Sequence, residues 1–341
     1  MEKKPDSGLA REAQALVERS RAEMAKRIVG KEGLVRGILT GVIAGGHVLL
    51  EGVPGLAKTL AVKTFAEIAG LQFSRVQFTP DLLPADITGS LVYEQETGRF
   101  VPRRGPVFAN IVLADEVNRA PAKVQSALLE AMEEGQVTLG ESSIPLPEPF
   151  FVMATQNPIE HEGTYPLPEA QLDRFLIKVV AAYPAAEEEL EIVRRVAGEP
   201  RAPVDRVLGP AQIAFLRRAA EAVQVDEGLA AYAVRVVRST RPRAPAPEGE
   251  RGKSLEQPRD LARDLGRWIE YGASPRASIH LYRCARIRAL MDGRGYVLPD
   301  DIKAAAPEVL RHRLVLSYEA EADGVSADDV VARILAALAL P

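Results

Sequence analysis

The octapeptide at residues 52–59 limits the possible fold of this chain more than any other feature. It reads Gly52-Val53-Pro54-Gly55-Leu56-Ala57-Lys58-Thr59. An apolar run, His47 to Glu51, comes directly before it, and a helical pattern from Thr59 to Ala69 follows and is closed by Gly70. A strand, a glycine-rich loop and a helix in this order form the setting that the P-loop motif requires. We therefore predict a loop that wraps around phosphate.

The residue types of this loop suit a nucleotide. Glycines let the backbone approach closely, so that successive N–H groups and a helix N-terminus face the phosphate oxygens. Lys58 would supply a positive charge to the β- and γ-phosphates, and the Thr59 hydroxyl would bind Mg²⁺. We assign residues 52–60, through Leu60, to nucleotide binding. Ala57 stands where most P-loops have glycine, and we expect an ordinary right-handed φ there. The alternative is a plain glycine- and proline-rich turn.

Short apolar runs alternate with helical patterns over the first half of the chain, which indicates a parallel sheet with helices on both faces. The five runs are His47 to Glu51, Phe73 to Phe78, Ile111 to Asp115, Phe150 to Thr155 and Phe175 to Val179. Two segments read as hairpins that interrupt this order. One is Ser90 to Phe100, and the other is Gln136 to Ile144, with its turn at Gly140.

The sequence changes character after Tyr183-Pro184, where the remaining patterns are helical and proline disfavours continuation of the preceding element. We predict an α/β nucleotide-binding core over residues 1–183, which includes an N-terminal helix and both hairpins. A smaller, all-helical domain follows over residues 184–341. Within it, residues 241–259 are rich in proline, glycine and charge and read as an exposed loop.

Two adjacent carboxylates, Asp115 and Glu116, end the buried run that begins at Ile111. Side chains at the C-terminal edge of a parallel sheet project into the ligand crevice. Asp115 would hold Mg²⁺, and Glu116 would polarise the attacking water as a general base. Alone, the pair could equally be two solvated acids at the end of a strand.

Three further polar residues give weaker signals. Asn157 follows the fourth run and could orient water, or it could form an Asn-Pro turn. Arg174 could reach the phosphate of a neighbouring subunit, but its spacing favours an intrachain pair with Asp173 or Glu169. Arg276 lies in the first turn of a helix that Ser274 caps. It could return a positive charge to the nucleotide or be an ordinary surface arginine.

Composition excludes several classes of protein. The 341 residues are 47% hydrophobic, which is ample for a core, and the net charge of -4 provides no global attraction to nucleic acid or anionic lipid. The single cysteine forbids an intrachain disulfide, and the four scattered histidines give no zinc-ligand spacing. No apolar stretch approaches the roughly 20 residues that a membrane span needs. We therefore expect a cytoplasmic protein without membrane insertion.

Together these residues resemble the AAA+ superfamily, and specifically its MoxR family, over most of the chain. The tracts that carry the resemblance are Asp115 to Ala120, Gln125 to Thr138, Ala154 to Pro158, Glu162 to Phe175, Gly272 to Ala277, Leu310 to Arg313 and Glu319 to Glu321. The N-terminal helix and the stretch from Arg241 to Arg259 match it poorly.

The resemblance implies roles that spacing alone does not settle. Asn157 becomes sensor 1, Arg276 becomes sensor 2, and Arg174 becomes the arginine finger. Val29-Gly30 matches the segment near adenine. The two hairpins match the helix-2 insert and the pre-sensor-1 insert. The resemblance also implies a hexameric ring with ATP and Mg²⁺ at its subunit interfaces. Such rings remodel proteins and often have partners with a von Willebrand factor A domain.

Two other functions stay open at this point. A DNA-translocating motor is one, because replicative helicases share both inserts. Arg99, Arg103 and Arg104 form a small basic cluster beside the first hairpin, which could contact an acidic substrate or nucleic acid or equally belong to a solvated hairpin. The acidic net charge makes nucleic acid an unlikely partner. A nucleotide-gated scaffold without catalysis is the other, and the presence of Glu116, Asn157 and Arg174 argues against it.

Overall fold

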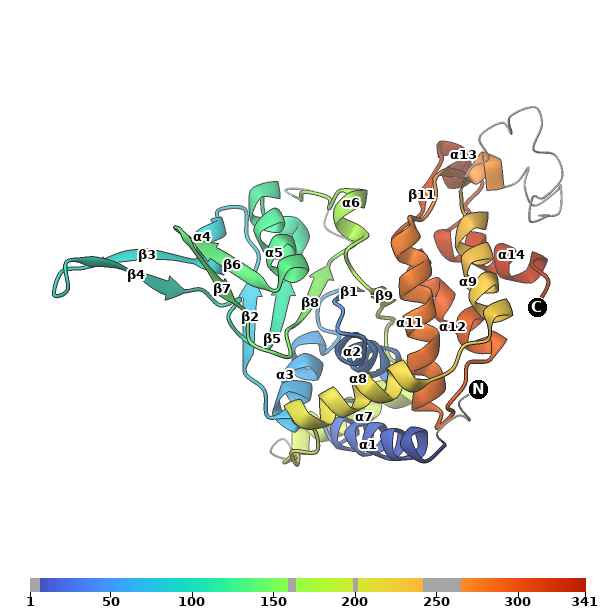
Figure 1. Cartoon of the computed structure of the whole chain (residues 1–341), viewed down its shortest axis with the longest axis horizontal. Helices are drawn as coiled ribbons and strands as arrows, with labels where there is room; N and C mark the ends of the chain where they lie inside the picture. Colours follow the sequence, from blue (N-terminus) through green and yellow to red (C-terminus); the bar gives the residue numbers. More distant parts are fainter. Residues whose placement is uncertain (1–6, 159–163, 199–201, 242–264) are drawn as a thin grey trace. The chain divides into compact units, whose positions relative to one another are not determined.

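The computed structural model describes residues 7–158, 164–198, 202–241 and 265–341. Its internal packing divides it into two compact units. The first, Gln14–Arg218, is called here the sheet unit. The second consists of Ala219–Pro341 with the residues up to Ala13 and is called the helical unit. Figure 1 labels the elements of both units in chain order.

A five-stranded sheet of order β2-β5-β8-β1-β9 forms the centre of the sheet unit. All its neighbouring strands pair in parallel, as the alternation of strands and helices predicted. The strands are β1 (Val48–Glu51), β2 (Phe73–Gln77), β5 (Ile111–Asp115), β8 (Phe151–Gln156) and β9 (Ile177–Val180). The inner strands are buried almost throughout, which explains their unbroken apolar sequences.

Helices α2 (Glu32–Ala44) and α3 (Lys58–Ala69) cover one face of this sheet. Glycine lets α2 approach the strands closely. A Cβ atom at Gly41 would lie 2.6 Å from the Phe151 ring and 2.7 Å from a methyl group of Val48, so a larger residue would push the helix away. Both helices end in a left-handed glycine, Gly45 and Gly70, and the sequence predicted the end of α3 at Gly70.

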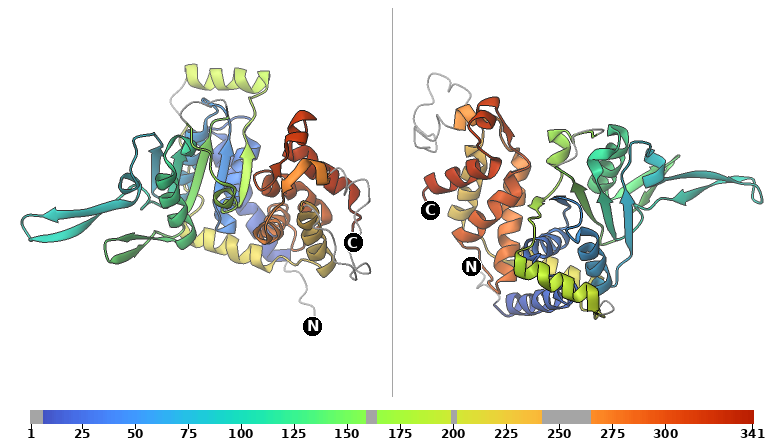
Figure 2. Two further views of the ribbon diagram at one scale, coloured as in Figure 1. Left: turned by 90° about the horizontal axis from the view of Figure 1, so that it is seen from above. Right: turned by 180° about the vertical axis from the view of Figure 1, so that it is seen from behind.

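Helix α5 (Ala122–Glu134) covers the opposite face, so the sheet lies between two helical layers (Figure 2). A short 3₁₀ turn, η1 (Val117–Arg119), leads into it. The apolar side chains of α5 belong to the same core as those of β5 and β8. They are Val124, Leu128, Leu129 and Met132 on the helix, and Val112, Ala114, Val152 and Ala154 on the strands.

Both predicted hairpins are present, and each is longer than its sequence pattern suggested. The first pairs β3 (Gly89–Glu94) with β4 (Arg99–Arg104) after the short helix α4 (Pro84–Thr88). The second pairs β6 (Gln136–Leu139) with β7 (Ser142–Pro145). The β3–β4 ribbon extends away from the sheet (Figure 1). Nearly every residue on both of its faces is exposed.

The sheet unit extends further along the chain than the change of sequence at Pro184 suggested. Helices α7 (Ala186–Gly198) and most of α8 (Pro210–Ala222) fall within it, as do α6 (Glu169–Leu172) and most of α1 (Ser7–Ala25). Hydrogen bonds to carbonyl groups of α2 and α3 explain why these segments belong to the sheet unit. The N–H groups of Val207 and Leu208 both donate to the carbonyl of Ile68, at 2.9 and 3.0 Å. Arg217 Nε donates to the carbonyl of Val42 at 3.2 Å.

The helical unit contains α9 (Glu227–Ser239), α11 (Pro275–Met291), α12 (Pro299–Leu310), α13 (Tyr318–Ala322) and α14 (Ala327–Ala337). It also has a two-stranded antiparallel ladder of β10 (Ile269–Tyr271) and β11 (Val315–Leu316), which differs from the all-helical prediction. The loop predicted at residues 241–259 lies outside the described residues apart from Arg241. Among the helices described, none combines the length and apolar character that crossing a bilayer requires.

Candidate functional site

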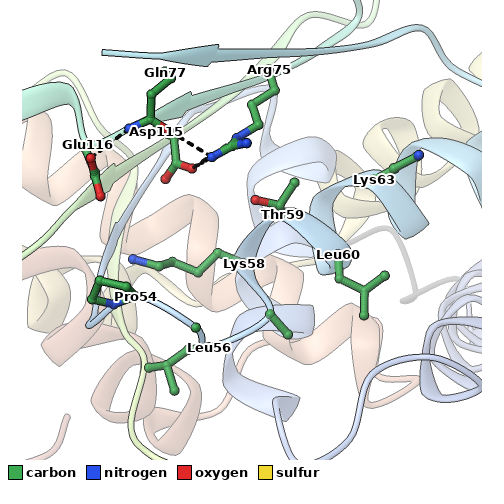
Figure 3. A pocket seen from close by; sticks show the side chains of 12 residues that line it. Pro54, Leu56, Lys58, Thr59, Leu60, Lys63, Arg75, Gln77, Asp115 and Glu116 are labelled. Atoms are coloured by element: carbon green, nitrogen blue, oxygen red, sulfur yellow. Dashed lines mark hydrogen bonds and ion pairs between the residues drawn. The ribbon is translucent and has the colours of Figure 1, made fainter. Parts of the chain in front are cut away.

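A cavity of about 560 Å³ lies at the carboxyl ends of the sheet strands, beside the glycine-rich loop (Figure 3). It gathers the residues that the sequence singled out as a loop and as an acidic pair. The lining residues are Pro54, Gly55, Leu56, Ala57, Lys58, Thr59, Leu60, Lys63, Arg75, Gln77, Asp115 and Glu116. Because β8 is the neighbour of both β5 and β1, the two motifs are brought to the same edge of the sheet from opposite sides of one strand.

The backbone of the loop is left-handed at Ala57, with φ 56° and ψ 22°, so the expectation of an ordinary φ there is wrong. Gly55 also has a positive φ, of 85°. Left-handed residues next to right-handed ones turn successive N–H groups into one concavity, which is the backbone nest that binds anions. An alanine in this region costs roughly 1 kcal/mol, which glycine would avoid. The shape of the loop therefore imposes on Ala57 a backbone conformation that alanine disfavours.

Lys58 begins helix α3 and is 9% exposed. Its Nζ donates to the carbonyl of Gly52 at 2.6 Å, and Figure 3 shows its ammonium group beside Pro54. Burial lowers the pKa of Lys58, while the negative charges of Asp115 and Glu116 oppose that shift. The cavity therefore holds one buried cation that faces two carboxylates.

Asp115 is also 9% exposed, and both of its oxygens are engaged. Thr155, on the neighbouring strand β8, donates its hydroxyl to Oδ1 at 2.6 Å. Arg75, on β2, donates to Oδ2 from Nη2 at 2.7 Å and from Nε at 3.2 Å. The carboxylate is thus fixed from two strands that flank β5 on either side.

Glu116 has a left-handed backbone, with φ 57°, and Ala57 is the only other non-glycine residue of the described chain with a positive φ. Its N–H donates to the Thr155 hydroxyl at 2.8 Å. Its Oε2 accepts from Gln77 Nε2 at 2.7 Å and from Arg119 Nη1 at 3.3 Å. Strained backbone of this kind clusters at functional sites because the surroundings over-determine it.

Sequence reasoning missed four residues of the site: Arg75, Gln77 and Thr155, which belong to this network, and Lys63, which lines the cavity. Arg75 and Gln77 are two residues apart in the strand that begins at Phe73, so they lie on the same face of it. Two polar side chains on one face of a strand within the sheet were the signal that could have pointed to these residues. Arg119, which lies in the tract from Asp115 to Ala120 that carries the family resemblance, pairs with Glu116.

The loop and the segment at Val29-Gly30 both lie against the chain that leaves β9. A Cβ atom at Gly52 would lie 2.9 Å from the Cβ of Ala181. Gly30, with φ 62°, lies against the carboxylate of Glu188, where a Cβ would be 2.1 Å from Cδ. Val29, Gly30 and the loop belong to the same sheet unit, and Gly30 and Gly52 each approach a residue that follows β9.

Asn157 follows β8 directly and is 5% exposed, but it is not among the residues that line the cavity. Arg174 Nη2 pairs with Glu133 Oε2 at 2.9 Å, so its partner is at the end of α5 and is neither Asp173 nor Glu169. Arg276 belongs to the helical unit, where its N–H donates to the capping hydroxyl of Ser274 at 3.1 Å.

The oxygen donors of the cavity suit Mg²⁺ shared with a polyphosphate. Mg²⁺ takes a few protein oxygens and completes its octahedron with water and phosphate. Thr59 and Asp115 offer a hydroxyl and a carboxylate in one cavity with Lys58. Within the described residues, no group of three or more His, Cys, Asp or Glu side chains could hold a metal ion. A metal ion in this cavity would therefore need phosphate and water as further ligands.

Comparisons with known proteins identify the family of the chain. The family model described as "ATPase family associated with various cellular activities (AAA)" matches residues 47–177, and the model of the "AAA lid domain" matches residues 266–334. The chain is similar to Chaperone MoxR1 of Mycobacterium tuberculosis, with 50% identity over 98% of this chain and 84% of that protein. It is 31% identical to Protein MoxR of Methylorubrum extorquens over 90% of this chain and 88% of that one.

A crystal structure of a Cytophaga hutchinsonii protein, provisionally named an ATPase, has a similar fold. Its TM-score is 0.88 at 43% sequence identity, over 98% of this chain and 97% of that one. The relatives therefore cover both the sheet unit and the helical unit. The chain belongs to the MoxR family of AAA+ ATPases.

Proposed function

We propose that this protein hydrolyses ATP to ADP and phosphate in a Mg²⁺-dependent reaction at the cavity beside residues 52–60. The observation that carries the proposal is that Lys58, Thr59, Asp115 and Glu116 line one cavity at the carboxyl edge of the sheet. A buried ammonium, a hydroxyl next to a helix N-terminus and two carboxylates are the groups that bind and cleave a nucleoside triphosphate. The backbone at Gly52, Val53, Pro54, Gly55, Leu56, Ala57 and Leu60 would complete the phosphate and ribose contacts.

The residues have distinct roles in this reaction. Lys58 pairs with the β- and γ-phosphates, and Thr59 and Asp115 are the metal ligands. A bound Mg²⁺ would neutralise the charge that develops on the phosphates. Glu116 accepts a proton from the attacking water. Gln77 and Arg119 both donate to its Oε2. In this proposal they hold the carboxylate in place, and Oε1 takes the proton from the water.

Residues further from the cavity complete the site in this proposal. Val29 and Gly30 contact adenine, and Asn157 orients the water from the end of β8. Arg276 contributes its charge from the helical unit. Arg174 acts on the nucleotide of a neighbouring subunit in a hexameric ring, and its pair with Glu133 holds it when no neighbour is present.

We further propose that hydrolysis drives the remodelling of partner proteins, including ones with a von Willebrand factor A domain. The name of the relative MoxR1, a chaperone, supports this choice. A DNA-translocating motor is the less favoured alternative. It predicts strong, salt-sensitive stimulation of ATP hydrolysis by DNA, a result that would reject the remodeller.

Two variants test the site. Lys58→Ala should lose ATP binding, measured by calorimetry, and retained affinity would show that the loop is misassigned. Glu116→Gln should bind ATP normally but turn it over at least 100-fold more slowly, since a general base typically contributes 10²–10⁴-fold. The same variant with ATP should retain client proteins in a pull-down, because the release step is blocked.

A further inference from the structure

The edge strand β2 places two polar side chains against the acidic pair. Arg75 and Gln77 are two residues apart, so they lie on the same face of the strand. The register of β2 with β5 sets Gln77 opposite Asp115. Arg75 Nη2 donates to Gln77 Oε1 at 2.8 Å as well as to Asp115, so the two side chains form one connected unit. Figure 3 shows this unit along one wall of the cavity.

The contact between Arg75 and Asp115 joins a half-exposed cation to a buried anion. The side chain of Asp115 is 13% exposed, and its second oxygen accepts from Thr155. The side chain of Arg75 is 47% exposed. Because its guanidinium is half exposed, Arg75 can turn into water when it leaves Asp115, whereas Asp115 is held in place by Thr155.

Arg75 occupies the carboxylate that the proposed metal needs. A divalent cation bound to Asp115, directly or through water, would come close to a guanidinium that lies 2.7 Å from Oδ2. Two cations on one carboxylate repel each other, and the low dielectric of a partly buried cavity strengthens that repulsion. The arginine and the metal ion are therefore competitors for the same oxygen.

We propose that Arg75 is a stand-in cation, which neutralises Asp115 in the absence of metal and releases it when the metal–nucleotide complex binds. This inference rests on the proposed Mg²⁺-dependent nucleotide site. In metal-free protein, Arg75 shields the phosphates from the charge of Asp115. Before the metal–nucleotide complex can bind at Asp115, the Arg75–Asp115 pair must be broken. Arg75 is thus a positioning residue that narrows the gap in affinity between metal-free ATP and Mg²⁺–ATP.

A direct phosphate ligand would behave differently. Its loss would weaken metal-free ATP and Mg²⁺–ATP to a similar degree, because phosphate is present in both. Lys63 provides the matched control. It lines the same cavity from α3, carries the same charge as Arg75 and is not a partner of Asp115 among the described residues.

The test is calorimetric measurement of the Kd for ATP, once in excess EDTA and once in saturating Mg²⁺. The full chain is compared with Arg75→Met, Arg75→Gln and Lys63→Met. In both Arg75 variants we expect Kd to rise about three- to tenfold in EDTA and to stay the same or fall in Mg²⁺. The ratio of the two constants therefore grows. In Lys63→Met both constants rise together and the ratio stays within about twofold of the unmodified chain.

Three outcomes would overturn the inference. An equal rise of both constants in the Arg75 variants would make Arg75 a phosphate ligand, and unchanged constants would make the ion pair irrelevant to binding. A ratio that shrinks would reverse the sign of the effect. If the unmodified chain itself binds no ATP under either condition, the proposed function fails, and that result is separate from any effect of Arg75.

Discussion

The hydroxyl of Thr155 donates to Asp115 Oδ1 at 2.6 Å, so that one buried side chain of β8 fixes an acid of β5. The same hydroxyl accepts the N–H of Glu116 at 2.8 Å and thereby supports a left-handed residue. One oxygen atom thus anchors both carboxylates of the site, although it does not line the cavity itself.

Thr155→Val should therefore damage both stability and catalysis. Valine has the same shape but leaves a buried N–H and a carboxylate oxygen unsatisfied, which costs about 1–3 kcal/mol in free energy of unfolding. We expect ATP turnover to fall about tenfold or more, because Glu116 loses its backbone anchor. Urea denaturation and steady-state kinetics measure the two effects. Thr155→Ser keeps the hydroxyl, and equal losses in both variants would contradict this assignment.

Arg174→Ala should reduce ATP turnover while leaving the Kd for nucleotide unchanged, if Arg174 acts in a neighbouring subunit. Glu133→Gln is the matched control because it breaks the intrachain pair and keeps the arginine. A purely structural pair would give both variants the same defect. Mixing Arg174→Ala with Lys58→Ala chains should restore part of the turnover, since each variant supplies what the other lacks. Mixtures without any recovery would remove support for action across an interface.

His47 should make the protein less stable in acid. The buried ring lies between Val152 N, 3.1 Å from Nδ1, and Met132 O, 3.0 Å from Nε2, and burial lowers its pKa to about 4. In the unfolded chain His47 has its ordinary pKa of 6.5, so between pH 6.5 and about 4 the unfolded chain binds a proton that the folded chain does not bind. Stability from this residue is therefore complete above pH 6.5. It declines as pH falls from 6.5 to about 4, by about 3 kcal/mol in total.

The measurement for His47 is the free energy of unfolding at several pH values between 7 and 4. His47→Gln cannot titrate, so its stability should change less steeply with pH than that of the unmodified chain. Parallel pH profiles would show that other groups are responsible for the acid sensitivity.

Ala57→Gly should stabilise the protein by about 0.5–1 kcal/mol, because glycine adopts a φ of 56° without the strain that alanine bears. The greater entropy of glycine in the unfolded chain offsets part of this gain. Ala57→Val is the opposite control and should destabilise by more than 1 kcal/mol, since β-branched residues tolerate left-handed backbone least. Midpoints of urea denaturation test both. A destabilised glycine variant would show that the left-handed backbone at this position carries little strain.

The sequence predicts the central sheet well because burial on both faces leaves an unbroken apolar signal over each strand. It predicts β10 and β11 poorly, because strands of three and two residues are too short for any periodicity. The boundary between the two units at Arg218 cannot be predicted from the sequence for another reason. Helices after Pro184 look alike in sequence whichever unit they pack on, and hydrogen bonds such as Arg217 to Val42 decide the matter.

Within the site, motif residues such as Lys58 and Asp115 could be named from the chain alone, since their spacing from strands reveals them. Arg75 could not, because its importance comes from the strand order that sets β2 beside β5. The left-handed φ of Ala57 was also out of reach. A residue's own preference pointed the other way, and the tertiary shape of the loop overrode it.

The β3–β4 ribbon has one further consequence. Two strands alone are marginally stable in water. In this ribbon Tyr93 is 53% exposed and Phe100 is 65% exposed, and their rings pack edge to face with centroids 5.3 Å apart. Its root is held differently, since Gly105 N donates to Thr88 O at 3.2 Å. The outer half should therefore open and close many times for each global unfolding event. Amide hydrogens near Gly98 would exchange fast while those at Gly105 stay protected, so that a binding event at the tip would register as slowed exchange.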